Sequence, residues 1–83
     1  MITKSITVVE KKEPDRAVPL LVQTASQFNS RIIFNRDEKT ANVKSIMGML
    51  NFGMIPGSTI EVTVEGDDEQ DAMGSIEAFL TQA

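Results

Sequence analysis

The sequence predicts an α+β domain of the open two-layer kind, in which a four-stranded antiparallel sheet carries three helices on one face. Four short segments have strand patterns and three have helical patterns, in the order βαββαβα. Short strands interleaved with helices are typical of helices layered on one antiparallel sheet. No internal repeat, linker or low-complexity tract divides the 83 residues. We therefore expect a single domain spanning residues 1–83.

The chain begins with a strand and a helix. Residues 2–9 alternate between apolar and polar side chains, which indicates a half-buried strand. The helix that follows is expected to begin between Asp15 and Pro19, because proline has no amide hydrogen and is tolerated only in the first turn. It is expected to end at Asn29 and Ser30. Its apolar face, at helical spacing, consists of Val18, Leu21, Val22, Ala25 and Phe28.

A hairpin and an isolated strand supply the rest of the sheet. Residues 31–35 and 40–43 have strand patterns on either side of the polar turn 36–39, which predicts a hairpin. Residues 59–65 form the clearest strand, because every second side chain is Ile or Val. Gly66 ends that strand.

The last helix follows Gly66 and reaches the chain end. Asp67, with Gln70 three positions later, resembles a capping box in which Asp replaces Ser or Thr. Acidic residues at the start of this segment favour a helix N-terminus through the helix dipole. The apolar face of this helix consists of Met73, Ile76, Phe79 and Leu80.

The stretch "VKSIMGMLNFG", residues 43–53, predicts a very short helix with two apolar faces. On a wheel advancing about 100° per residue, Met49 and Phe52 share one face. Ile46, Met47 and Leu50 make the other. A helix on a sheet buries one such stripe. Either face could therefore point inward, leaving the other for a partner protein, or another segment of the chain could cover the second face.

Ser45 opens this helix and Gly53 closes it. Serine is a favoured N-cap residue, because its oxygen accepts a hydrogen bond from an amide of the first turn. The same hydroxyl is a candidate for phosphorylation, since a phosphate at the positive end of a helix is held by unpaired amides. Both roles are open at this point.

Several classes of function are disfavoured by composition. The net charge of −4 argues against non-specific nucleic-acid binding. The chain has no Cys and no His, which removes thiol chemistry, the commonest metal ligand and the usual general base. It also lacks a phosphate-binding glycine loop and a metal-loop spacing. We expect a protein that is not an enzyme and has no cofactor, no metal and no membrane segment. The N-terminus lacks a signal-peptide pattern, so we expect a cytoplasmic location.

Three motifs carry a resemblance to a known family. "VKSIMGML", "LLVQTASQF" and "GDDEQDA" together closely resemble HPr, the phosphocarrier of the bacterial sugar phosphotransferase system. The resemblance implies an HPr-like fold. In HPr of the Bacillus type, HPr kinase/phosphorylase phosphorylates the serine of this block, which maps onto Ser45. The phosphorylated protein is then a corepressor for catabolite control protein A.

The same resemblance assigns the two faces of the short helix. In the family its outward face docks partner proteins, which matches Ile46, Met47 and Leu50. We therefore expect Met49 and Phe52 to face the sheet.

The chain departs from the family at the other phosphorylation site. HPr has a His-Ala-Arg-Pro-Ala motif, and this chain reads Pro14-Asp15-Arg16-Ala17-Val18 there. Pro14 occupies the phosphohistidine position and has no nucleophile. Arg16 matches the motif arginine, which in the family lies near the regulatory serine and helps to bind its phosphate. The chain thus resembles Crh, a family type that lacks the histidine and keeps the serine, although Crh has glutamine where this chain has Pro14.

The resemblance implies a regulatory adaptor whose partners are HPr kinase/phosphorylase and a regulator of the catabolite control protein A type. One alternative is an HPr-like module that binds phosphotransferase-system proteins without using Ser45 phosphorylation. A further alternative is a phosphocarrier with another acceptor. Asp15 is the nearest candidate, since aspartate can form acyl phosphates.

Overall fold

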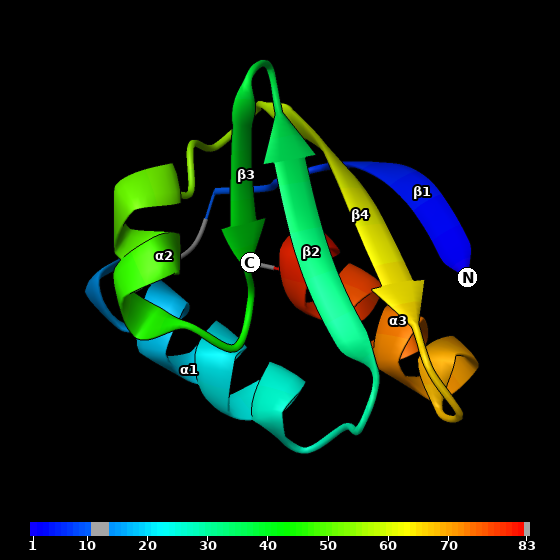
Figure 1. Ribbon diagram of the computed structural model, residues 1–83. Coiled ribbons are helices and arrows are strands. Elements are labelled where there is room, and N and C mark those ends of the chain that lie inside the picture. The colour runs from blue at the N-terminus through cyan, green and yellow to red at the C-terminus, as the bar shows by residue number, and fades with distance from the viewer. Residues whose placement is uncertain (11–13, 83) are drawn as a thin grey trace.

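The computed structural model describes residues 1–10 and 14–82, with the backbone alone for Pro14 and Asp15. Its elements follow the predicted order βαββαβα (Figure 1). They are β1 (Ile2–Thr7), α1 (Pro14–Ser26), β2 (Arg31–Arg36), β3 (Lys39–Asn42), α2 (Ile46–Phe52), β4 (Thr59–Glu65) and α3 (Glu69–Thr81).

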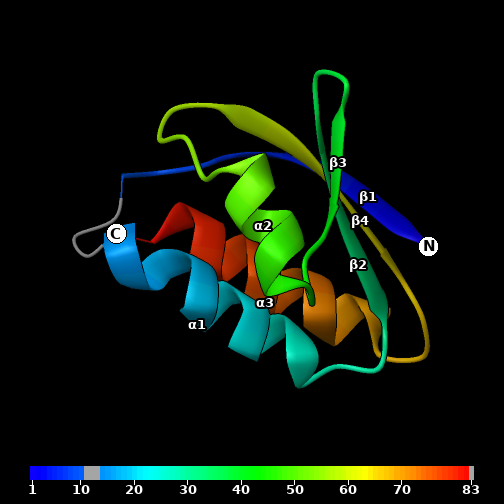
Figure 2. The ribbon, with the colours of Figure 1, turned by 60° about the vertical axis from the view of Figure 1, so that its left-hand side comes forward.

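The four strands form one antiparallel sheet in the order β1-β4-β2-β3. The register sets Ile6 opposite Ile60, and Phe34 opposite Val62 on one side and Ala41 on the other. All three helices lie on the same side of this sheet (Figure 2). The predicted open-faced two-layer α+β fold is therefore confirmed.

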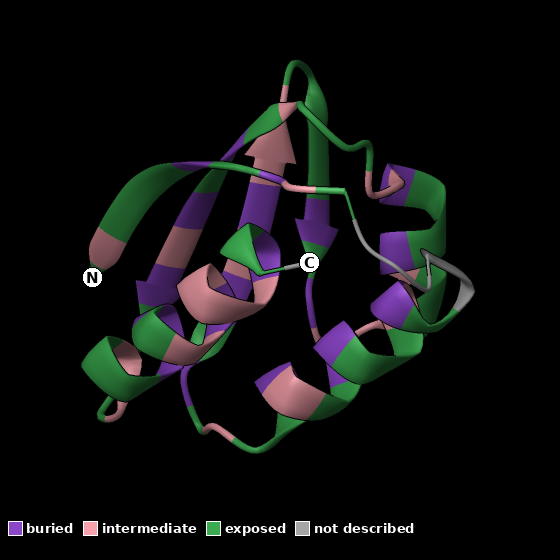
Figure 3. Cartoon of the chain, turned by 180° about the vertical axis from the view of Figure 1, so that it is seen from behind, coloured by how far each residue is buried: buried purple, intermediate pink, exposed green. Residues whose placement is uncertain are grey.

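The hydrophobic core lies between the sheet and the helices, and the inward sides of the helices are buried (Figure 3). The predicted apolar faces supply it. Leu21, Val22 and Ala25 of α1 and Met73, Ile76 and Leu80 of α3 are all buried. The remaining members of the two faces, Val18, Phe28 and Phe79, are partly buried and pack against the core.

The strand predicted for residues 2–9 is wrong at its end. β1 stops at Thr7, and the next two amides leave the β1–β4 ladder. The Val8 amide donates to the Ser58 carbonyl at 2.9 Å, and the Val9 amide donates to the Leu80 carbonyl at 3.0 Å. Val8 stays buried, which preserves the apolar pattern that the sequence shows. The apolar–polar alternation of residues 2–9 reflects which side chains are buried. Here the buried positions continue beyond the last residue of the strand.

The expectation that Pro19 lies in a first helical turn is also wrong. α1 begins at Pro14, so Pro19 lies inside the helix and removes one backbone hydrogen bond. The Pro19 ring is exposed. Solvent at that face can hydrate the backbone carbonyl that would otherwise accept a hydrogen bond from residue 19. A proline inside the helix is therefore tolerated at this position. The helix ends at Ser26, before the predicted Asn29.

The predicted capping box at Asp67 and Gln70 is not formed. The N-cap of α3 is Asp68, and its side chain makes no capping bond. The Asp68 carboxylate instead accepts hydrogen bonds from the Asn29 amide at 2.8 Å, from the Ser30 amide at 2.9 Å and from the Ser30 hydroxyl. The Ser30 hydroxyl, and then the Asn29 amide, hold the pKa of Asp68 below its ordinary value.

Gly66 makes this link between loops possible. Its φ of 154° lies where side chains are disfavoured, and an added Cβ would come within 2.7 Å of the Ser30 Cα. The loop before α3 can therefore approach Ser30 closely only with glycine at this position.

Candidate functional site

Ser45 is the N-cap of α2, as the sequence predicts. Its backbone is extended, and its Oγ accepts a hydrogen bond from the Gly48 amide at 3.1 Å. The Ser45 amide donates to the Asn42 carbonyl at 3.0 Å, which ties the cap to the end of β3. The side chain is partly exposed. A hydroxyl that caps the helix is therefore also within reach of solvent.

Two neighbours shape the surroundings of Ser45. A Cβ on Gly48 would lie 3.3 Å from the Ser45 Oγ, so the glycine leaves the hydroxyl uncrowded. The Lys44 ammonium donates to the Phe28 carbonyl at 2.6 Å, just beyond the end of α1. This bond holds the start of α2 to the C-terminal end of α1.

One apolar face of α2 is buried and the other is exposed. Met49 and Phe52 are buried, with exposed fractions of 0% and 3%. Ile46, Met47 and Leu50 are exposed by 51%, 72% and 59%. Of the arrangements that the helical wheel left open, the structure has the one with Met49 and Phe52 inward, which confirms that expectation. No segment among the described residues buries the outward side chains.

Arg36 is a residue of this site that sequence reasoning did not find. It lies at the end of β2, and its guanidinium donates to the Gly53 carbonyl at 2.8 Å and to the Phe52 carbonyl at 2.5 Å. The same group lies 4.4 Å from the centroid of the Phe52 ring. Arg36 shares the parity of the buried Ile32 and Phe34 along the strand. This alternation was the available signal, because it directs Arg36 toward the helix side of the sheet.

Arg16 and Ser45 lie on different helices, in the first turn of α1 and at the N-cap of α2. Arg16 is exposed, and the Lys44 ammonium next to Ser45 binds the Phe28 carbonyl just after α1. Ser45 and the outward side chains belong to the same helix. The side chains of Pro14 and Asp15 lie outside the described part of the chain.

Two further large apolar side chains are exposed near these elements. Leu20 lies on α1, and Ile55 lies in the loop that follows α2. Neither was a predicted site residue. Leu20 is adjacent to the buried Leu21 in the sequence. Two neighbouring leucines do not by themselves indicate which side chain is exposed to solvent.

Charge is unevenly distributed along the chain. Although the net charge is −4, residues 16–36 and 39–60 contain no Asp or Glu. These stretches supply nearly all of α1, the hairpin strands and the whole of α2. The described carboxylates lie instead at Glu10, at the hairpin turn, on β4 and around α3. A phosphate on Ser45 would introduce a strong negative charge into a segment that has none.

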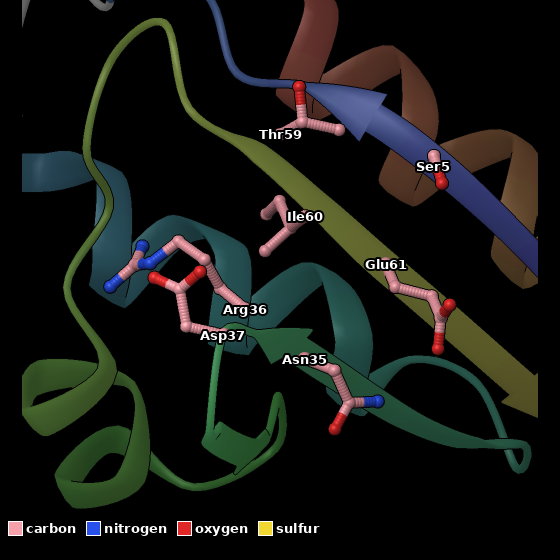
Figure 4. A pocket seen from close by; sticks show the side chains of 7 residues that line it. All are labelled: Ser5, Asn35, Arg36, Asp37, Thr59, Ile60 and Glu61. Atoms are coloured by element: carbon pink, nitrogen blue, oxygen red, sulfur yellow. The ribbon is translucent and has the colours of Figure 1, made fainter.

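A shallow polar pocket of about 300 Å³ lies between the hairpin turn and the start of β4 (Figure 4). Glu61 and Asp37 line it, and Arg36 lies at its border with its guanidinium directed toward the α2–β4 loop. No buried side-chain polar atom among the described residues lacks a hydrogen-bond partner.

Within residues 1–10 and 14–82, no three His, Cys, Asp or Glu side chains gather in a way that could hold a metal ion. None of the helices in that part of the chain combines the length and the apolar character needed to cross a membrane.

Comparisons with known proteins agree on one family. The family model for the PTS HPr component phosphorylation site matches residues 2–82. The HPr-like protein Crh of Halalkalibacterium halodurans is 45% identical over 65 residues, covering 78% of this chain and 77% of that protein. Phosphocarrier protein HPr of Treponema pallidum is 40% identical over 81 residues, covering 96% and 92%.

A solved structure supports the same assignment. The crystal structure of phosphocarrier protein HPr from Bacillus anthracis superimposes with a TM-score of 0.89 at 34% identity, and the match covers 96% of each chain. The short capped helix, the element order and these matches together show that the chain belongs to the HPr family.

Proposed function

We propose that this protein is a Crh-like regulatory adaptor of the HPr family. In this proposal HPr kinase/phosphorylase phosphorylates Ser45, and the modified protein acts as corepressor with a regulator of the catabolite control protein A type. The protein does not carry phosphohistidine. It works in the cytoplasm, where these partners act, and it needs no cofactor or metal.

One observation carries the proposal. The Ser45 hydroxyl opens a helix whose Ile46, Met47 and Leu50 side chains are all exposed. A modifiable hydroxyl and an apolar docking face thus lie within two turns of the same helix. Exposed apolar side chains in such a group favour protein contact, and the flexible thioether of methionine adapts to different partners.

Phosphorylation at this position is compatible with the fold. A dianionic group at the start of α2 is favoured by the helix dipole and by free amide groups. Lys44 is the adjacent residue and carries a positive charge, whereas acidic residues are absent from 39–60. The phosphate should therefore leave the helix in place and present its charge beside the docking face.

The missing histidine argues against the family's carrier activity. The chain contains no histidine, and the resemblance aligns Pro14 with the phosphohistidine. Proline has no side-chain nucleophile, so phosphoryl transfer from enzyme I has no acceptor there. An acyl phosphate on Asp15 is the remaining route to a carrier.

The test is incubation with HPr kinase/phosphorylase and ATP, followed by intact-mass measurement. The chain should gain one phosphate, and Ser45→Ala should abolish the gain. Ser58→Ala is a matched control, because Ser58 is a partly exposed serine in the turn just before β4. Modification that survives in Ser45→Ala would overturn the assignment of the serine.

A second incubation with enzyme I and phosphoenolpyruvate separates the adaptor from a carrier. The protein should stay unlabelled. A phosphate that is labile in both acid and alkali, and that Asp15→Asn removes, would instead support the acyl-phosphate carrier.

A docking module that works without phosphorylation is the second candidate. It is favoured by the exposure of Ile46, Met47 and Leu50 in the unmodified chain, since this face is ready before any phosphate is added. Equal binding of the modified and unmodified protein to its partner would select this candidate.

A further inference from the structure

The short helix α2 depends on groups outside itself. It has seven residues and contains no charged side chain. Isolated helices shorter than about 12–15 residues are marginal in water, so tertiary contacts must hold this one. Ser45 and Lys44 secure its start. Its C-terminal end has no basic residue in the last turn to meet the free carbonyls.

Arg36 supplies the missing partner from another element. Its two Nη atoms donate separately to the carbonyls of Phe52 and Gly53, which are the last residue of α2 and its C-cap. In Figure 4 the Arg36 side chain reaches toward the loop that follows α2. The guanidinium also lies over the Phe52 ring, whose other neighbour is the Phe34 ring at a centroid distance of 6.0 Å.

The chemistry of this contact requires arginine. A planar guanidinium can meet two adjacent carbonyls and an aromatic face at once, whereas an ammonium is a single point charge. Positive charge is also favoured at a helix C-terminus. Arg36 therefore closes the last turn and joins it to a buried ring of the core.

We propose that Arg36 is a positioning residue for the docking face of α2. By holding the carbonyls of Phe52 and Gly53, it keeps the last turn formed and sets the direction of Leu50 relative to Ile46 and Met47. This inference deepens the proposed function and rests on it for the identity of the docking face. Ser45 is secured by separate contacts at the other end, so Arg36 governs docking and leaves phosphorylation unaffected.

The first arm of the test needs no partner. Amide hydrogen exchange and methyl chemical shifts are measured by NMR in the full chain and in Arg36→Met, Arg36→Lys and Arg31→Met. Methionine retains much of the side-chain length without the donors. Arg31→Met removes the same charge from an exposed position on the same strand.

The Gly53 amide, which donates to the Met49 carbonyl at 3.0 Å, is the reporter of the last turn. Arg36→Met should accelerate its exchange by about tenfold or more, since hydrogen bonds to a charged group are lost. The Leu50 methyl signals should also shift in Arg36→Met. For both the exchange rate and the methyl shifts, Arg36→Lys should give values between those of the parent chain and Arg36→Met, and Arg31→Met should match the parent chain. Unchanged exchange and shifts in Arg36→Met would overturn the proposal, as would equal acceleration of Gly53 and of the central strand β4.

The second arm measures function. The Arg36→Met chain should accept phosphate from the kinase at the parent rate, yet bind the regulator about tenfold more weakly, and Arg36→Lys should recover part of that loss. Parent-like binding in Arg36→Met despite a frayed last turn would contradict the positioning role. If the phosphorylated parent chain itself binds no regulator, the proposed function fails, and the first arm still decides whether Arg36 sets the geometry of α2.

Discussion

Ser45 and Met47 lie two positions apart, yet they would contribute to docking through different forces. Ser45 offers a hydroxyl for a charged group, and Met47 is the most exposed of the outward side chains of α2. A phosphate enclosed with a partner cation depends on charge, whereas Met47 gains by leaving water. The two contributions can be separated by substitution.

We predict that the loss of regulator binding is largest for Ser45→Ala, smaller for Arg16→Ala and smallest for Met47→Ala. Breaking a buried phosphate–cation contact costs about 2–5 kcal/mol, and one apolar anchor is worth roughly 1–2 kcal/mol. Arg16 falls between them if it approaches the phosphate in the complex, because it would then supply one charged contact among several. Titration calorimetry with each variant, after kinase treatment, gives the order. A larger loss for Met47→Ala than for Ser45→Ala would contradict it.

Met49 lies on the inner side of α2, so its substitution should affect stability, whereas substitution of Met47 should affect binding. Met49→Ala should lower the free energy of unfolding by about 2–5 kcal/mol, because it removes buried side-chain atoms and leaves a cavity. Met47→Ala should change it by no more than about 0.5 kcal/mol, as expected for an exposed position. Urea unfolding measures both. Similar losses in the two variants would mean that α2 does not present two distinct faces.

At the scale of elements, the loops at one end of the molecule are joined by a single carboxylate. Asp68, before α3, binds the amides of Asn29 and Ser30 in the loop between α1 and β2. This link fixes the start of α3 to the start of the central strand β2. Its strength depends on ionisation, because a protonated carboxyl accepts hydrogen bonds less well.

We predict that Asp68→Asn lowers the melting temperature by several degrees at neutral pH. The pKa of Asp68 is depressed in the fold, so the link contributes stability above the unfolded-state pKa of about 3.9 and loses it as pH falls through the folded value. The difference between the parent chain and the variant should therefore shrink in acid. Thermal unfolding followed by circular dichroism across pH 3–7 measures it. Asp67→Asn is the matched control, since the Asp67 side chain is exposed, and an equal effect in that variant would contradict the prediction.

These elements also show what the sequence could and could not predict. Periodicity identified the buried faces of α1 and α3, because burial repeats along a helix. For α2 it showed two apolar faces, and the family resemblance was needed to choose the inward one. It could not choose Asp67 or Asp68 as the N-cap, since the partners of Asp68 lie 38 and 39 residues away in the chain. Arg36 was missed for the same reason, because its bonds reach residues 16 and 17 positions further on. Ser45 was found because a cap is a local feature.

At the scale of the whole molecule, negative charge is unevenly distributed along the chain. The stretch 39–60 carries no carboxylate, while the described acidic side chains lie elsewhere. A phosphate on Ser45 would add negative charge to a stretch whose only charged residues are Lys39 and Lys44. A partner can detect this change with one cation beside an apolar groove.

The most direct test of the account is the affinity of the regulator for the phosphorylated and unphosphorylated chain, measured side by side at the same ionic strength. The account predicts that phosphorylation of Ser45 strengthens binding by about 30-fold or more, corresponding to at least about 2 kcal/mol. It also predicts that the gain falls as salt is raised. Equal affinities for the two forms would contradict the central claim that Ser45 phosphate and the apolar face of α2 act together.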